Sequence, residues 1–174
     1  QISSMTLAAG GILSQTTAQV LYPRMSREFG RTGDAGAALR LATRPLLALA
    51  LLGLPVVALG WALLPPFVGW LLPRYLPGVQ AAQWSLLSVY LLYLTPTLNL
   101  YPVTGRLSAY LAVVLLSAGA FLAAVPWRLA ASPGDPLAGM AQAMAAGVAV
   151  FAGAGNVGAL LLARWGRPVP GPRA

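Results

Sequence analysis

The sequence contains no cysteine, no histidine and no lysine, and it has only three acidic residues. Without cysteine, disulfides, thiolate catalysis and zinc–thiolate sites are excluded. Without histidine or paired carboxylates, there is no acid–base pair and no metal-ligand cluster. We therefore expect a protein that is not an enzyme and that has no cofactor and no metal site.

The acidic residues Glu28, Asp34 and Asp135 all fall in segments that we expect to be loops. A proton or sodium pump usually places a carboxylate at membrane depth. Ion coupling through a carboxylate would therefore need a group outside this chain.

Charge is missing from long stretches of the chain. Charge-free runs cover residues 1–23, 45–73, 75–105, 107–127 and 136–163. About 20 mostly apolar residues suffice for an α-helix to cross the hydrocarbon core of a bilayer. Only 8% of the residues are charged and the mean hydropathy is +0.74, whereas a soluble domain is about a quarter charged. The sequence predicts an all-α, polytopic membrane protein with about five transmembrane helices.

Proline, glycine and arginine set the predicted boundaries. We expect membrane spans near residues 2–22, 45–72, 79–102, 107–125 and 137–163, and a disordered tail over 167–174. Between the first two spans, five arginines and Gly30, Gly33 and Gly36 predict a loop. Pro23 is expected to end the first helix, and Pro55 to kink the second.

The arginines divide unequally between alternate loops. On one side are Arg24, Arg27, Arg31, Arg40, Arg44, Arg106, Arg164, Arg167 and Arg173; on the other are Arg74 and Arg128. Short cytoplasmic loops carry the excess of positive charge in membrane proteins. The larger set, and with it the C-terminus, is therefore predicted to be cytoplasmic. The arginines give the chain a pI near 11.2. Because they lie where the chain is predicted to leave the membrane, we expect membrane lipids as their partners and no nucleic acid.

Polar and aromatic side chains inside the predicted spans are candidates for a substrate path. They are Gln15, Gln19, Arg44, Gln83, Tyr90, Tyr93 and Asn99. The carboxamides could instead join helices by hydrogen bonds, as could Asn156. The two tyrosines could stack on a sugar ring or a prenyl chain, or simply pack. Arg44, directly before Pro45, could bind a phosphate bidentately or anchor the helix to lipid.

Small residues in the last predicted span favour close helix packing. Gly139, Ala143 and Gly147 recur at four-residue intervals, which lets helix backbones approach. Gly153, Gly155 and Gly158 form a GxGxxG pattern, but no strand precedes it, so packing is favoured over dinucleotide binding.

The order of these pieces resembles the polysaccharide and O-antigen flippase family. The resemblance lies in VLYPRMSREFGRTGD after a polar-striped helix, a long proline-containing span, LLPRYLPGVQAAQW, a short Gly-Arg turn, and PLAGMAQAMAAGVAVFAGAGNVGALLLARW. By this resemblance, Pro23, Arg24 and Ser26 match the loop after the family's second helix, and Tyr75 and Pro77 match the segment after its third. These positions look structural rather than catalytic. The superfamily also includes multidrug-and-toxin extruders and flippases of lipid-linked peptidoglycan precursors.

The resemblance implies a two-lobe transporter of a dozen or so spanning helices in a bacterial cytoplasmic (inner) membrane. This chain would supply the second to sixth helices of the C-terminal lobe. The partners implied are an undecaprenyl-diphosphate-linked oligosaccharide, which the whole protein would flip, and the missing N-terminal lobe. The first residue is Gln and no signal peptide is present, so we expect the chain to be the downstream part of a longer protein. A multidrug or cation exporter and a non-transporting scaffold subunit remain alternatives.

Overall fold

The computed structural model describes residues 19–165, and every regular element in that range is helical. The elements are a helix over residues 19–32, α2 (Ala35–Leu71), the 3-10 helix η1 (Pro73–Gly78), α3 (Val79–Tyr93), the 3-10 helix η2 (Pro96–Asn99), α4 (Leu100–Val103), α5 (Leu107–Ala131) and α6 (Pro136–Trp165). The predicted all-α class is confirmed for this part of the chain. Most of the predicted span 2–22, including Gln15, and the tail 167–174 lie outside the described residues.

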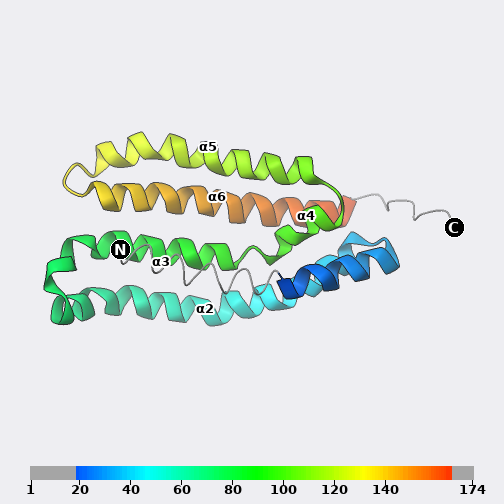
Figure 1. The fold of residues 1–174 in the computed structure, drawn as a ribbon, viewed down its shortest axis with the longest axis horizontal. Coiled ribbons are helices and arrows are strands. Elements are labelled where there is room, and N and C mark those ends of the chain that lie inside the picture. The colour runs from blue at the N-terminus through cyan, green and yellow to red at the C-terminus, as the bar shows by residue number, and fades with distance from the viewer. Residues whose placement is uncertain (1–18, 166–174) are drawn as a thin grey trace.

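The long helices lie side by side as an antiparallel bundle (Figure 1). α6 packs against both α5 and α3, and α3 packs against α2. At one end, the start of α2 meets the end of α6, where Gly36 faces the backbone carbonyl of Ala163. At the other end lie η1 and the loop between α5 and α6. The arginines of the larger predicted set that fall within the described residues belong to the first of these ends, and Arg74 and Arg128 belong to the second.

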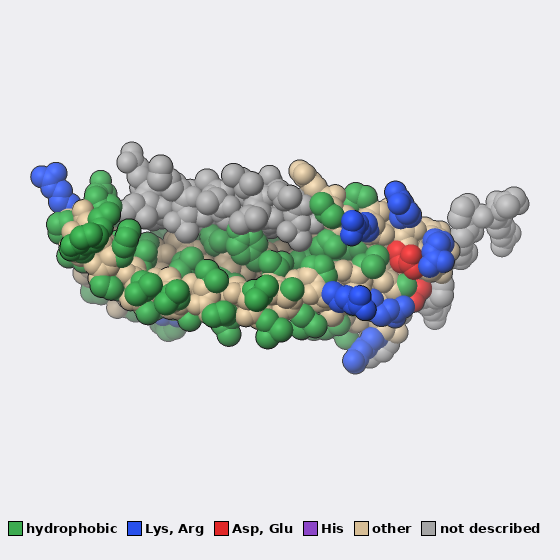
Figure 2. Space-filling model, turned by 90° about the horizontal axis from the view of Figure 1, so that it is seen from below, with side chains coloured by type: hydrophobic (Ala, Val, Ile, Leu, Met, Phe, Trp, Pro, Cys, Tyr) green, Lys and Arg blue, Asp and Glu red, His purple; other side chains and the backbone are tan. Residues whose placement is uncertain are grey.

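Three of the described helices are long and apolar enough to cross a membrane: α2, α5 and α6. The bent segment from η1 to α4 would make a fourth if it crosses as one span. Large apolar side chains cover the outside of the bundle; Leu51 is 74% exposed, Leu115 70% and Trp70 83%. Figure 2 shows hydrophobic side chains along the length of the bundle, with basic side chains gathered at its ends. Such a surface is suited to lipid.

The predicted loop over residues 23–44 is wrong, because most of it is helical. The helix over residues 19–32 continues through Pro23, and only residues 33 and 34 separate it from α2. Gly33 turns the chain with a φ of 66°, a conformation that glycine adopts without strain. Asp34 then caps α2 by accepting a hydrogen bond from the Gly36 amide at 2.8 Å.

This helical pair is amphipathic, which explains why its composition suggested a loop. Leu21 and Met25 from the first helix are buried against Ala38, Leu39 and Ala42 of α2. The arginines occupy the outer faces, and Arg24, Arg27 and Arg40 are exposed. A helix of this kind has a mixed composition although one face is fully apolar.

The predicted span 79–102 is not one continuous helix, because it is interrupted between α3 and η2. The two parts meet at a bend of 42°. The other differences are smaller: α2 begins ten residues before the predicted Pro45 and passes through Pro55 as one continuous helix, and α5 continues through Pro126 to Ala131. α6 begins and ends within two residues of the predicted range, and the predicted tight turn at Gly105 is present with a φ of 71°.

Candidate functional site

The break after α3 leaves backbone carbonyl groups without their usual helical donors. Pro96 has no N–H, so it cannot donate to the carbonyl of Leu92. The Thr95 hydroxyl takes that place and donates to Leu92 at 2.6 Å. Asn99 donates from its side chain to the carbonyl of Pro96 at 3.1 Å. Polar side chains therefore replace part of the helical hydrogen bonding inside an apolar bundle.

Asn156 of α6 completes this arrangement from the other side. Its Nδ2 donates to the carbonyl of Leu94 at 2.8 Å and to that of Ala152 at 2.8 Å. Its Oδ1 accepts a hydrogen bond from the hydroxyl of Thr97. Thr97 is buried and Asn156 is half-buried. One side chain thus uses both its donor and its acceptor atoms to hold the break against α6.

Glycines of α6 allow the segment after the break to approach closely. A Cβ at Gly155 would lie 2.7 Å from Leu98 Cδ1, and a Cβ at Gly158 would overlap the hydroxyl oxygen of Tyr101. The Tyr101 hydroxyl donates to the carbonyl of Gly155 at 3.0 Å. Gly153 faces open space. Two of the three glycines in the GxGxxG pattern therefore serve helix packing, as the sequence indicated.

A second set of polar contacts joins α2 to α3. Gln83 Nε2 donates to the carbonyl of Trp61 at 2.8 Å, and the hydroxyl of Tyr90 donates to that of Ala50 at 3.0 Å. Gly53 lies directly under the Tyr90 ring. Both acceptors are in α2, about 16 Å apart at 1.5 Å per residue. Gln83 and Tyr90 therefore hold helices together at two separate points.

The end of the bundle where α2 starts carries a basic recess. The recess has a volume of about 550 Å³ and is lined by Glu28, Ala37, Arg40, Leu41, Thr43 and Arg44. Two ion pairs flank it: Arg31 binds Glu28 at 2.8 Å, and Arg40 lies 3.6 Å from Asp34. The hydrogen bond and the negative charge of Glu28 raise the pKa of Arg31, so this arginine is charged at any physiological pH.

The predicted path residues do not form one cluster within the described residues. Gln83 and Tyr90 bind α2, Asn99 bonds within its own turn, and Tyr93 is half-buried at the end of α3. The other two described residues are exposed: Gln19 lies at the start of the first described helix, and Arg44 lines the basic recess. Gln15 lies outside the described part of the chain.

The sequence indicated that Asn156 could join helices by hydrogen bonds, but it did not predict which groups Asn156 would bind. Its partners Thr97 and Leu94 lie 59 and 62 residues earlier in the chain. The available signal was local: a single asparagine in an Ala/Gly helix, and a Thr-Pro-Thr sequence in another predicted span.

Comparison of the chain with models of known protein families, with curated proteins and with solved structures gives no match.

Proposed function

We propose that this chain is part of one lobe of a transporter that flips a lipid-linked oligosaccharide across a bacterial cytoplasmic membrane. Two observations carry the proposal. The bundle consists of helices with long charge-free segments, and its arginines divide between its two ends. The order of these segments also resembles that of the polysaccharide flippases. By this proposal, the end that holds the start of α2 and the end of α6 faces the cytoplasm.

The hydrogen bonds between helices support a role as one rigid lobe of a transporter, with no substrate path through the bundle itself. Gln83, Tyr90 and Asn156 are bonded to backbone groups of neighbouring helices. We therefore assign these three residues to the construction of the lobe. The substrate path would then run along a face shared with the rest of the longer protein. A lobe held in this way can rock as one body to open a central cavity to alternate sides.

A flippase has to carry a diphosphate and a sugar headgroup through a layer of low dielectric constant. An isolated charge placed there costs several kcal/mol or more. Polar side chains along a water-filled path lower this barrier, and no covalent bond has to form or break. The described residues hold no cluster of three or more acidic, histidine or cysteine side chains, and the proposal assigns no chemical step to them.

Reconstitution of the full-length protein in vesicles tests the proposal. We expect transfer of an undecaprenyl-diphosphate-linked oligosaccharide between leaflets, at a rate above that of protein-free vesicles.

Three results would separate the alternatives. Failure to transfer any lipid-linked glycan contradicts the proposal. Export of cationic drugs by the same vesicles would instead identify a multidrug or cation exporter. Full function in a variant with alanine at Gln15, Gln19, Arg44 and Tyr90 would favour a scaffold subunit that transports nothing.

A further inference from the structure

The basic recess is lined by Glu28 of the helix over residues 19–32 and by residues of α2. Arg44 directly precedes the charge-free part of α2, residues 45–71. At about 1.5 Å per residue this part is about 40 Å long, against about 30 Å for the hydrocarbon core and 40–45 Å with the headgroup layers. If α2 crosses the membrane, Arg44 lies in one headgroup layer and Arg74 in the other.

The groups that line the recess are suited to a phosphate. Arg40 and Arg44 are four residues apart and therefore lie on the same face of α2, and both line the recess. Within the described part of the chain, no carboxylate forms an ion pair with Arg44. A guanidinium group binds phosphate oxygens bidentately, and a pair of them can hold one phosphate from two sides.

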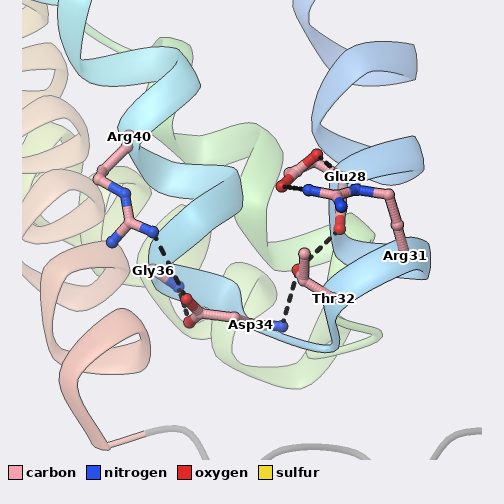
Figure 3. Close-up of polar contacts among 6 residues, drawn as sticks. All are labelled: Glu28, Arg31, Thr32, Asp34, Gly36 and Arg40. Carbon is pink, nitrogen blue, oxygen red and sulfur yellow. Dashed lines mark hydrogen bonds and ion pairs between the residues drawn. The ribbon is translucent and has the colours of Figure 1, made fainter.

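The two carboxylates nearby leave this preference in place. Glu28, on the wall of the recess, is held by Arg31 from its own helix, and Asp34 lies against Arg40 at an exposed position (Figure 3). Residues 19–44 contain five arginines and two carboxylates, which gives a net charge of +3. The recess is therefore positive, and Glu28 is the group in its lining that would repel an anion.

Apolar groups at the recess favour a lipid over a free anion. Leu41 lines the recess and is 40% exposed, and Leu47, less than two turns further along α2, is 55% exposed. Pro45 has no N–H, so the carbonyl of Leu41 lacks its usual helical donor and can accept a hydrogen bond from a headgroup hydroxyl or ammonium. The volume of about 550 Å³ lies within the range of small-molecule sites.

We infer that this recess is a binding site for the phosphate of an anionic phospholipid of the surrounding leaflet, held by Arg40 and Arg44. The inference is independent of the proposed transport function, because it concerns a lipid that stays bound rather than one that is carried.

Native mass spectrometry of the full-length protein in neutral detergent, titrated with phosphatidylglycerol, tests the inference. We expect the Arg40→Ala/Arg44→Ala variant to bind this lipid about tenfold more weakly, as loss of a charge-assisted hydrogen bond implies. Glu28→Gln should bind it about two- to fivefold more tightly, because one repulsive charge is removed. A gain of this kind cannot come from a folding defect. Arg40→Lys/Arg44→Lys keeps the charge but loses the bidentate geometry, and should bind about threefold more weakly.

The matched control is Arg24→Ala/Arg27→Ala, which removes two exposed arginines outside the recess. The affinity of this control for phosphatidylglycerol should stay within about twofold. Its two arginines do not line the recess, and a neutral micelle has no anionic surface that they could bind. An equal loss in this control would overturn the inference, as would unchanged binding in the Arg40/Arg44 variants.

Displacement of the lipid by excess inorganic phosphate would assign the recess to a free anion. Preference for a polyprenyl diphosphate over phosphatidylglycerol would assign it to a carried lipid. Either result overturns the resident-lipid assignment.

Discussion

Gly158→Ala is expected to destabilise the bundle by about 2–3 kcal/mol, a large effect for a single added methyl group. The added Cβ would overlap the hydroxyl oxygen of Tyr101, whose side chain is only 1% exposed and bonded to the carbonyl of Gly155. A buried ring of this kind cannot move aside without disturbing its neighbours, and overpacking a core costs about 1–3 kcal/mol. Reversible unfolding in mixed micelles of mild and denaturing detergent measures the change.

Tyr101→Phe gives this prediction a sharp control. Without the hydroxyl, the nearest ring atom to the added Cβ is Cζ at 3.4 Å, which is an ordinary contact distance. The Gly158→Ala/Tyr101→Phe double variant should therefore be about as stable as Tyr101→Phe alone, which loses one hydrogen bond worth about 1 kcal/mol. The cycle should give a coupling energy of about 2 kcal/mol. Gly153→Ala faces open space and should be neutral or slightly stabilising. Additive effects of Gly158→Ala and Tyr101→Phe would contradict the described packing.

Asn156→Leu is expected to destabilise the bundle by about 2 kcal/mol. Leucine has a similar size but makes none of the three hydrogen bonds. The Leu94 carbonyl therefore loses the donor that Asn156 supplies, and the Thr97 hydroxyl loses its acceptor. Hydrogen bonds between helices in a membrane average about 0.6 kcal/mol and reach about 1.7, and a buried carbonyl without a partner adds its own penalty. The same unfolding assay measures the loss.

Asn99→Ala is the matched control for Asn156→Leu. Its side chain bonds only to Pro96 in the same turn, so its loss should cost less than about 1 kcal/mol. If Asn156→Leu is no more destabilising than Asn99→Ala, the break after α3 is not held by α6 in the way described.

The pattern of apolar runs and charges predicted the helix ends more accurately than the positions of the prolines did. The ends of α6 and the start of α5 were predicted within two residues, because charge, turn residues and apolar runs coincide there. α2 contains Pro45, Pro55, Pro65 and Pro66 and still runs as one helix, whereas Pro96 lies at a break. Proline removes the same donor in each case, so local sequence does not distinguish them.

The difference lies in what surrounds the freed carbonyl groups. Near Pro96, Thr95 and Asn156 supply donors, and Asn156 comes from a helix 62 residues further along the chain. Buried polar partners of this kind make irregular backbone tolerable inside a membrane. The sequence supplied the candidate polar residues, but which of them would meet depends on the packing of α3 against α6. For the same reason, Gln83 and Tyr90 could be singled out from the sequence, while their acceptors on α2 could not.

The most direct test of the account is labelling of single cysteines in intact cells, for which these 174 residues contain no cysteine that would have to be replaced. The account predicts that Ser26→Cys and Ser108→Cys react with a membrane-impermeant maleimide only after the cytoplasmic face is opened. Leu76→Cys and Ala131→Cys should react from outside. Leu52→Cys should remain unlabelled from either face, although this position is 72% exposed on the bundle, because lipid covers it. Rapid labelling at position 52, or labelling of positions 26 and 108 from opposite faces, would contradict the account.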